Sequence, residues 1–346
     1  MIDFSSDTVT QPTDQMWTAM REARFGCMPN SENSSITELE ALAAKLTGKQ
    51  NSLFLPTTTM ANLVALLSHT QPGDQILLDS KSHILWSEEW AYANICGLTA
   101  RTIETEAGTI LVNQIESALS EHQFLQRPQI TLICIENSHN AFGGTIIHAD
   151  SMRELGNTSR KHRIPIHLDG ARILNASVAL NETLETMVAD ADSVAISLCK
   201  GLSAPEGSML CGSQAFIAKC KRNAKRLGGG SLHKADIPAA AGIVAFNNML
   251  PQLAEDNRRA YELGKGISAL DHQAFSIRAV QTNIVMLTVD PNFLAAETLL
   301  HQLEKRNIKA KLYSDSTIRF VTHRHIDDAD IVSVVHNITE ILELFS

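Results

Sequence analysis

The stretch Ser193-Val-Ala-Ile-Ser-Leu-Cys-Lys200-Gly201 indicates the fold more directly than the rest of the sequence. Residues 193–198 are small or apolar throughout, which is typical of a strand buried on both faces of a mostly parallel sheet. Lys200 follows directly beyond the expected strand. Because ligands of open α/β sheets bind beyond the carboxyl ends of the strands, Lys200 is a candidate site residue.

Comparable apolar runs recur along the first 245 residues and alternate with helical patterns. They span residues 52–55, 75–78, 130–135, 164–168 and 207–211. Several of them end in polar side chains, namely Asp79, Glu136, Asn137 and Asp169. Strands that alternate with helices predict an α/β fold with a mostly parallel sheet, and the polar strand ends predict a single site at its edge.

The pattern changes after about residue 245. Strands are expected near residues 284–289, 310–313 and 317–322, with helices over 292–306 and 328–344. We therefore expect a large domain over residues 36–245 and a small C-terminal α+β domain over residues 246–346. Residues 1–35 form an irregular N-terminal segment in this interpretation, because the first helix signal is the capping-box pattern Ser35-Ile-Thr-Glu38.

The composition excludes several classes of protein. The net charge of −9 argues against nucleic acid or an anionic membrane as a partner, since both are bound through an excess of Lys and Arg. No apolar run of about 18 residues would span a bilayer, and the first residues lack the features of a signal peptide, so we expect a cytoplasmic protein. The six cysteines form no C-x-x-C pair and the histidines no H-E-x-x-H motif, so neither disulfides nor a metal site is expected.

Two strand ends carry residues suited to related chemistry. An amine such as Lys200, shielded from solvent at a sheet edge, has a depressed pKa and suits imine formation. In His167-Leu-Asp-Gly-Ala-Arg172, the Asp169 carboxylate suits the nitrogen of a pyridine ring and Arg172 suits a phenolate or carboxylate oxygen. Each residue also has a structural alternative: a solvated lysine in a turn, a helix cap, and a surface ion pair.

A helix start and a histidine complete the candidate set. Thr57, Thr58 and Thr59 open an apolar helical run, where hydroxyls and unpaired N–H groups suit a phosphate, although simple N-capping explains them equally well. His83 follows the strand end at Asp79, where an imidazole would either stack on a cofactor ring or serve a structural role. Each residue alone fits its structural alternative, and only the combination of these residues is specific for a cofactor site.

With these residues in place, the chain resembles the L-threonine aldolase and aromatic amino acid β-eliminating lyase family, whose members are fold-type I enzymes that depend on pyridoxal 5′-phosphate. The shared motifs extend along nearly the whole chain. They are Asp3-Phe4, Ser6-Asp-Thr-Val-Thr10, Thr59-Met-Ala-Asn62, Ser82-His83-Ile84, Glu136-Asn-Ser-His-Asn140, His167-Leu-Asp-Gly-Ala-Arg172, Lys200-Gly-Leu-Ser-Ala-Pro205 and Leu227-Gly-Gly-Gly230.

The resemblance implies a cofactor role for six residues, and one of them, Arg172, would also bind substrate. Lys200 would hold pyridoxal 5′-phosphate as a Schiff base, Asp169 would bind the ring nitrogen, and His83 would stack on the ring. These three residues form the implied catalytic set. Thr58 and Thr59 would bind the phosphate group at the helix start.

The resemblance also implies how substrate is bound. Arg172 would lie near both cofactor and substrate, and would bind the substrate carboxylate together with Ser6 and Arg319. The alternative for Arg319 is a surface charge on a strand. A contribution of the N-terminal segment to the active site is implied as well, as is a homo-oligomer, either a dimer or a tetramer, with shared sites.

The chain departs from the family pattern at several positions. Where the family commonly has Gly-Asp-Asp-Val-Tyr-Gly-Glu-Asp-Pro-Thr, this chain has Gly26-Cys-Met-Pro-Asn-Ser-Glu-Asn-Ser-Ser35, in a loop that normally helps to close the substrate pocket. The Ser-Gly-Thr phosphate loop is Thr57-Thr58-Thr59, and the Met-Arg-Gln after the triple glycine is Ser231-Leu232-His233. The serine before the lysine is Cys199.

The expected reaction is cleavage of a β-hydroxy-α-amino acid, of the L-threonine or L-allo-threonine type, into glycine and an aldehyde. His83, His139 and a bound water are the alternatives for the base that takes the hydroxyl proton. The altered loop leaves β-elimination, racemisation or decarboxylation of another amino acid open. The non-enzyme alternative is a regulatory or scaffold protein with a vestigial cofactor site.

Overall fold

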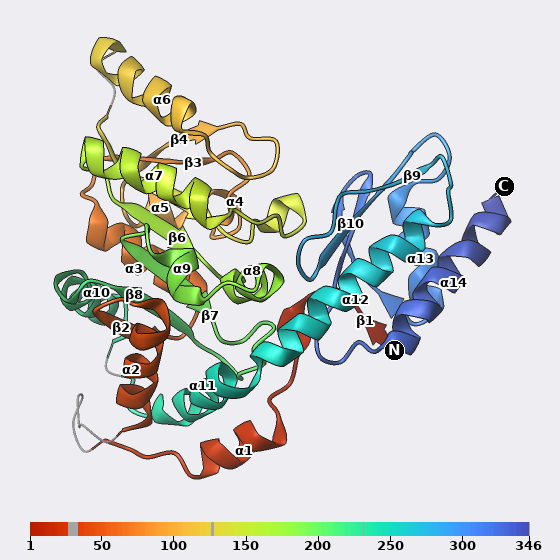
Figure 1. Ribbon diagram of the computed structural model, residues 1–346, viewed down its shortest axis with the longest axis horizontal. Helices are drawn as coiled ribbons and strands as arrows, with labels where there is room; N and C mark the ends of the chain where they lie inside the picture. Colours follow the sequence, from red (N-terminus) through yellow and green to blue (C-terminus); the bar gives the residue numbers. More distant parts are fainter. Residues whose placement is uncertain (27–33, 126–127, 231, 346) are drawn as a thin grey trace.

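The computed structural model describes residues 1–26, 34–125, 128–230 and 232–345, and its largest sheet has seven strands (Figure 1). The strand order is β2-β8-β7-β6-β5-β3-β4. The strands are β2 (Asn51–Leu55), β3 (Gln75–Asp79), β4 (Thr99–Ile103), β5 (Ile130–Glu136), β6 (Ile166–Asp169), β7 (Ser193–Ser197) and β8 (Ser208–Gly212). Of these seven strands only β8 runs in the opposite direction to the others, so the predicted mostly parallel sheet is confirmed.

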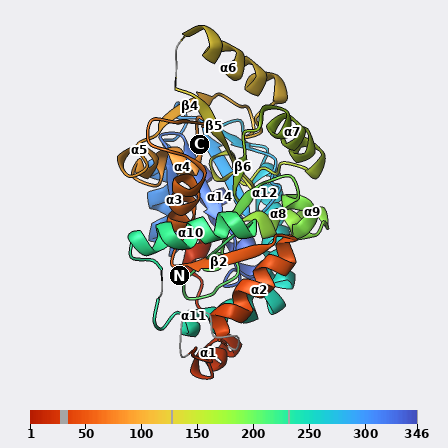
Figure 2. The ribbon, with the colours of Figure 1, turned by 90° about the vertical axis from the view of Figure 1, so that its left-hand side faces the viewer.

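Helices cover both faces of this sheet, because its central strands are apolar on both sides. One face packs against α3 (Thr58–His69), α4 (His83–Trp86), α5 (Ala91–Asn94) and α10 (Gln214–Arg226). The other face packs against α2 (Ser35–Thr47), α6 (Val112–Leu125), α7 (Ala149–His162), α8 (Ile173–Leu180), α9 (Leu184–Val188) and α11 (Asp236–Asn248). Figure 2 shows α3 and α10 over the same part of the sheet, where they contact each other.

A long helix, α12 (Leu250–Ser268), leads to a second sheet in the C-terminal part of the molecule (Figure 1). This antiparallel sheet has the order β12-β13-β10-β9. Its strands are β9 (Phe275–Ile277), β10 (Ile284–Val289), β12 (Lys311–Ser314) and β13 (Thr317–Val321), and its core includes residues of α13 (Ala296–Lys305) and α14 (Asp328–Phe345).

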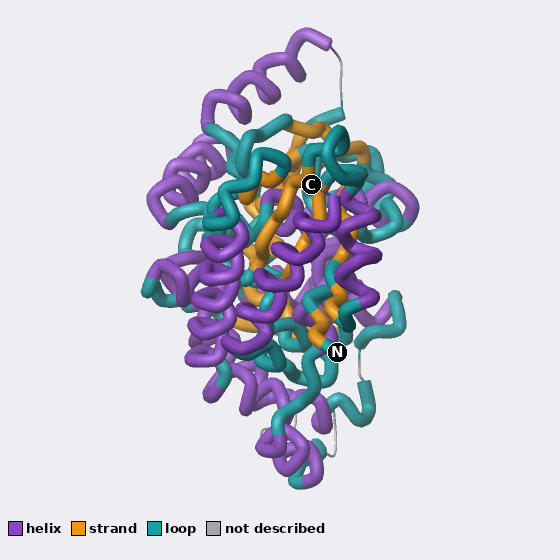
Figure 3. Tube along the Cα trace, turned by 90° about the vertical axis from the view of Figure 1, so that its right-hand side faces the viewer, coloured by secondary structure: helices purple, strands orange, loops and turns teal. Residues whose placement is uncertain are grey.

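The first residues of the chain belong to this C-terminal core. Strand β1 (Ile2–Asp3) pairs with β11 (Ile308–Lys309), and the ring of Phe4 packs edge-on against Phe320 with 5.9 Å between their centroids. Figure 3 shows both chain termini on this side of the molecule. The N-terminal segment therefore runs from the C-terminal core back toward the large sheet.

Two details of residues 1–47 differ from expectation. Helix α1 (Asp14–Arg21) forms where no helix was expected before residue 35, because Thr13 caps it by accepting the Met16 N–H at 3.2 Å and Met16 is buried in the core. Helix α2 is capped by Ser34, one residue before the predicted cap. In the described ranges, no helix combines the length and the apolar character needed to cross a membrane.

Candidate active site

The polar strand ends meet at one edge of the seven-stranded sheet. In the register of the sheet, Glu136 at the end of β5 lies opposite Asp169 at the end of β6. Lys200 follows three residues after the end of β7, the strand beside β6. The ends of β2 and β7 both pair with Ser208, so α3, which starts at Thr58, begins at this edge too. The structure thus brings these predicted site segments together.

Asp169 is held in a defined orientation by two donors. The Asn62 side-chain amide donates to Oδ2 at 2.9 Å, and the Ala171 N–H donates to Oδ1 at 3.2 Å. The residue is only 2 % exposed. The N-cap of the following helix α8 is Arg172, so Asp169 is not the helix cap that its structural alternative supposed.

His83 and Glu88 form a pair beside Asp169. His83 Nδ1 lies 2.9 Å from Glu88 Oε1, and the His83 backbone N–H donates to Glu136 at 2.8 Å. Burial alone would lower the pKa of His83, but the hydrogen bond to Glu88 and the surrounding carboxylates raise it. Burial, reinforced by the charge of Asp169, raises the pKa of Glu88.

The same three side chains have a spacing that a metal ion would accept. One ligand atom from each of His83, Glu88 and Asp169 lies within 4.8 Å of the other two. In the structure His83 bonds to Glu88, and Asn62 donates to both Glu88 and Asp169. Direct hydrogen bonding therefore accounts for the close approach of these groups.

Lys200 presents an amine that is not engaged by the protein. Within the described part of the chain, its side chain forms no hydrogen bond or ion pair. Burial lowers its pKa and the positive charge of Arg172 lowers it further, while Asp7 and Asp169 oppose the shift. The Thr10 hydroxyl donates to the Lys200 carbonyl at 3.0 Å and fixes the turn. Such a lysine is suited to imine chemistry, and it is not a fully solvated turn residue.

Arg172 lies in a buried ion pair and not at the surface. Its Nε donates to Asp7 Oδ2 at 2.6 Å and its Nη2 donates to Asp7 Oδ1 at 2.7 Å, while Nη1 donates to Asn140 at 3.2 Å. Burial would raise the pKa of Asp7, but the adjacent guanidinium holds it well below its usual range. Asn283 adds a further donor to Asp7 at 3.2 Å. The pair ties the N-terminal segment to the sheet edge.

Arg319 reaches the same place from the C-terminal sheet. Its Nη1 donates to Asn140 Oδ1 at 3.0 Å, an acceptor that it shares with Arg172, and its Nη2 donates to the Ser5 carbonyl at 3.1 Å. Its Nε is buried and has no hydrogen-bond partner among the residues that the structure describes. Burial and the charge of Arg172 lower the pKa of Arg319 to about 10. A buried guanidinium with an open donor suits a carboxylate ligand, so Arg319 is no surface charge.

The remaining predicted residues lie nearby with local roles. Thr57 is the N-cap of α3 through its hydroxyl, and Thr58 and Thr59 are the first two helical residues, whose N–H groups have no acceptor within the helix. The Ser6 hydroxyl accepts the Thr8 N–H at 3.2 Å, directly before Asp7 in the chain. N-capping therefore occurs at this helix start, and the free N–H groups are compatible with the predicted anion site, which stays a prediction.

His139 is packed inside the protein and does not face the open edge. It is fully buried, its ring lies 4.9 Å from that of Phe142, and its Nε2 lies 3.3 Å from Asp79 Oδ1. A Cβ atom on Gly108 would lie 2.5 Å from the His139 ring. Contact this close leaves no room for a ligand on that side.

Some of the positions that depart from the family pattern lie outside the described residues. These are residues 27–33, which include Cys27, Met28 and Asn30, and residue 231. Leu232 and His233 line a cavity of about 410 Å³ between α2 and α10. Cys199 is half-buried, with its Sγ atom 3.6 Å from Ser197 Oγ.

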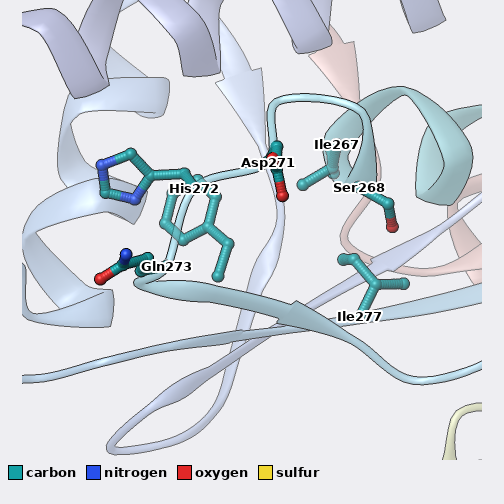
Figure 4. A pocket seen from close by; sticks show the side chains of 7 residues that line it. Ile267, Ser268, Asp271, His272, Gln273 and Ile277 are labelled. Atoms are coloured by element: carbon teal, nitrogen blue, oxygen red, sulfur yellow. The ribbon is translucent and has the colours of Figure 1, made fainter.

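A separate cavity of about 260 Å³ lies at the end of α12, far along the chain from these residues (Figure 4). It is lined by Ile267, Ser268, Asp271, His272, Gln273, Phe275 and Ile277. None of the predicted site residues lines it. The edge of the large sheet is therefore the candidate active site.

Sequence reasoning missed three residues of this site. Asp7 and Asn62 stand inside the motifs Ser6-Asp-Thr-Val-Thr10 and Thr59-Met-Ala-Asn62, so a signal for them was present. Glu88 had no such signal, because only its bonds to His83 and Asn62 distinguish it from other glutamates. All three bind a predicted site residue through a contact that the linear sequence does not show.

Comparison with known proteins identifies the family to which the chain belongs. The family model described as beta-eliminating lyase matches residues 3–292. Low-specificity L-threonine aldolase 1 of Arabidopsis thaliana is 35 % identical over 95 % of this chain and 93 % of its own length. The low specificity L-threonine aldolase of Escherichia coli K12 is 31 % identical over 96 % of this chain and 97 % of its own length.

Solved structures share the fold. A threonine aldolase of Leishmania major superimposes with a TM-score of 0.84 at 18 % identity, covering 99 % of this chain and 100 % of that chain. A putative L-allo-threonine aldolase of Listeria monocytogenes has a TM-score of 0.75 at 18 % identity, covering 95 % of this chain and 99 % of that chain. The predicted fold class is confirmed, and from the family match and the two aldolase relatives it follows that the chain belongs to the beta-eliminating lyase family.

Proposed function

We propose that this chain is a lyase that uses pyridoxal 5′-phosphate to cleave a β-hydroxy-α-amino acid, of the L-threonine or L-allo-threonine type, into glycine and an aldehyde. Its relatives from Arabidopsis thaliana and Escherichia coli, both named as L-threonine aldolases, support this reaction. The observation that carries the proposal is the unpartnered Lys200 amine of lowered pKa, placed at the same sheet edge as Asp169.

The residues at this edge fit the cofactor in their chemistry. Lys200 offers an amine for the cofactor aldehyde, and Asp169 offers an oriented carboxylate for the ring nitrogen. Thr58 and Thr59 offer hydroxyl and N–H donors for the phosphate. His83 offers a partly exposed ring, suited to stacking, at the same edge.

When bound, pyridoxal 5′-phosphate supplies a conjugated ring that takes up the electron pair of the breaking bond. Asp169 would favour a proton on the ring nitrogen, because its carboxyl group is held in place by two donors and can accept a hydrogen bond from that nitrogen. The lowered pKa of Lys200 favours its neutral amine, which is the form that acts as a nucleophile and accepts a proton. Asp169 would thus set the charge of the ring, and Lys200 would accept a proton at the site.

The two arginines would bind the substrate carboxylate. Arg319 Nε has no partner, and the Arg172 guanidinium is held beside it through the shared Asn140 oxygen. Ser6 lies in the N-terminal segment next to Asp7, which orients Arg172. Held in this way, the substrate would present its β-hydroxyl group away from the arginines.

The structure favours His83 over His139 as the group that takes the hydroxyl proton. His139 is fully buried, whereas the His83 side chain is 30 % exposed. The hydrogen bond to Glu88 would stabilise the imidazolium that proton uptake produces. His83 acts directly or through a bound water in this proposal.

The organisation of the chain supports three further proposals. Separate apolar cores beneath the two sheets support a large domain over residues 36–245, a small domain over 246–346, and an N-terminal segment over 1–35 that completes the site. The family resemblance supports a homo-oligomer, dimeric or tetrameric. Five cysteines among the described residues are free, which supports a reducing compartment such as the cytoplasm.

Cofactor attachment tests the role of Lys200. Purified protein mixed with pyridoxal 5′-phosphate should develop a visible absorbance band, and borohydride reduction should leave the cofactor mass on the peptide that contains Lys200. Lys200→Ala should lose both signals, while Lys265→Ala, a change at an exposed lysine, should keep them. A band that survives in Lys200→Ala, with the mass on another peptide, would overturn the assignment.

A further inference from the structure

A continuous chain of buried hydrogen bonds leads away from Asp169 beneath the site. Asn62 of α3 is fully buried, and its side-chain nitrogen donates to Asp169 Oδ2 at 2.9 Å and to Glu88 Oε1 at 2.8 Å. Its side-chain oxygen lies 3.0 Å from His167 Nε2. A single amide therefore contacts both carboxylates and a histidine that lies on the strand of Asp169.

The chain continues past His167 to a second histidine. His167 Nδ1 lies 2.9 Å from Ser193 Oγ in the neighbouring strand β7, and Ser193 Oγ lies 2.8 Å from His69 Nε2 at the end of α3. The His69 ring stacks on Phe216, with 4.3 Å between ring centroids. Residues from α3, β6 and β7 are thus linked by polar contacts inside an otherwise apolar interior.

The two carboxylates fix the orientation of the Asn62 amide. Only its NH₂ group can donate to both Glu88 and Asp169, so its oxygen must face His167. A carbonyl oxygen accepts and does not donate, so His167 Nε2 must carry a proton. The reversed amide would place its oxygen against two carboxylate oxygens and lose both bonds.

The remaining protons follow from the neutral state of both histidines. Burial lowers the pKa of His167 to about 4, and burial together with the charges of its neighbours lowers that of His69 to about 3. With its one proton on Nε2, His167 accepts the Ser193 hydroxyl proton at Nδ1. The Ser193 oxygen is then free to accept from His69 Nε2. Each bond in the chain therefore points toward Asp169 and Glu88.

We propose that Asn62 is a positioning residue that holds Asp169 and the His83–Glu88 pair as one unit, and that the directed chain from His69 through Ser193 and His167 locks its orientation. This inference rests on the proposed function, because Asp169 and His83 act there on cofactor and substrate. Asn62 itself is fully buried and donates to Asp169 and Glu88, so it would act on cofactor and substrate only through these residues.

The physical role of Asn62 is to separate two negative charges. Glu88 and Asp169 repel each other. Burial is the main cause of the raised pKa of Glu88, and the charge of Asp169 raises that pKa as well. Two amide protons between them offset this repulsion. Without the amide, Glu88 takes up a proton more readily. His83 then loses the negative charge of Glu88, and only Asp169 and Glu136 still favour its cationic form.

Histidine protonation in the cofactor-free protein gives the first test. With ¹⁵N-labelled histidine, NMR should show His167 and His69 as neutral Nε2–H tautomers between about pH 5.5 and 8.5. In Ser193→Ala, His69 should no longer be held in the Nε2–H tautomer. His167 should keep its tautomer, because the Asn62 oxygen still accepts a hydrogen bond from His167 Nε2. An Nδ1–H tautomer for His167 in the wild-type protein would overturn the proposal. This measurement does not depend on whether a variant folds.

Substitution of Asn62 gives the second test. In Asn62→Ala, His167 should no longer be held in the Nε2–H tautomer, and the pH midpoint of His83 titration should fall. Cofactor binding, measured by visible absorbance, should weaken at least tenfold. The matched control is Asn223→Ala, which removes another buried amide that donates to the Leu67 carbonyl and Ser68 hydroxyl of α3. Equal effects of the two variants, or an unchanged His83 midpoint in Asn62→Ala, contradict a positioning role. If the wild-type protein binds no cofactor, the proposed function fails but the hydrogen-bond chain does not, because the NMR results are obtained without cofactor.

Discussion

The carboxylate of Asp7 and the guanidinium of Arg172 form a buried two-bond ion pair, with Nε 2.6 Å from Oδ2 and Nη2 2.7 Å from Oδ1. The two residues are 165 positions apart in the chain. This pair brings the N-terminal segment to the active-site edge and holds Arg172 beside Arg319. Its geometry supports the proposal that the N-terminal segment completes the site.

Removal of Asp7 should therefore destabilise the protein strongly. Asp7→Ala leaves the Arg172 charge buried without its partner, which should cost about 3–5 kcal/mol in the free energy of unfolding. Urea unfolding of the cofactor-free protein measures this loss. Asp315→Ala, at an exposed turn residue, should change stability by less than about 0.5 kcal/mol. A loss for Asp7→Ala no larger than for Asp315→Ala would show that the pair does not support the fold.

Arg319 should act on substrate affinity. Its unpartnered Nε and its position beside Arg172 predict that Arg319→Ala raises the KM for the amino acid roughly 10- to 100-fold, as expected for loss of a hydrogen bond between charged groups. Cofactor affinity should change much less. Lys311→Ala, at the exposed residue opposite Arg319 in β12, is the control and should leave KM unchanged. A normal KM for Arg319→Ala would remove the arginine from the substrate site.

Glu88 should control the pH dependence of the reaction through His83. The Glu88 hydrogen bond and charge raise the pKa of His83, so Glu88→Gln should lower that pKa. If neutral His83 takes the substrate proton, the acidic limb of kcat/KM should then move to lower pH. Glu89→Gln changes the exposed neighbouring residue and should not move the limb. An acidic limb that stays in place, or that moves to higher pH, would exclude His83 as the titrating base.

Asp256 predicts a pH dependence of stability. Burial raises its pKa from the ordinary 3.8 to about 7, and within the described ranges its Oδ2 has no hydrogen-bond partner. Between about pH 4 and pH 7 the unfolded chain has released this proton while the folded chain keeps it, so stability must fall as pH rises through this window. The shift from 3.8 to about 7 spans about three pKa units, and at about 1.4 kcal/mol per unit the loss is roughly 4–5 kcal/mol.

Asp256→Asn should remove this part of the pH dependence and make the protein more stable than wild type above pH 7. Urea unfolding at several pH values measures it, with Glu255→Gln, a more exposed residue on the same helix, as the control. Parallel stability curves for wild type and Asp256→Asn would show that Asp256 is ionised in the folded protein near neutral pH.

The elements that the sequence predicted well are those that are buried on all sides. Strands at residues 130–136 and 193–197 are apolar on both faces, so their pattern is unambiguous, and they place Glu136 and Lys200 correctly at the sheet edge. The edge strand Thr99–Ile103 was not predicted, because it is largely exposed and has no apolar run. Helix α1 was missed because it is short and buries little besides Met16.

The candidate site shows the same division. Asp169 ends a buried strand and Lys200 follows one, so the local pattern was enough to predict their place at the sheet edge. The partners that orient the site residues were not predicted, since Asn62 meets Asp169 only across 107 positions of the chain. Long-range contacts of this kind depend on how α3 packs on the sheet, which periodicity alone does not determine.

The most direct test of the proposed reaction is the product analysis of cofactor-loaded protein with L-threonine, L-allo-threonine and L-phenylserine. We expect at least one of them to yield glycine and the matching aldehyde in equal amounts, and Lys200→Ala to yield neither. Absence of aldehyde from all three substrates, or formation of a 2-oxo acid in place of glycine, would contradict the proposed cleavage.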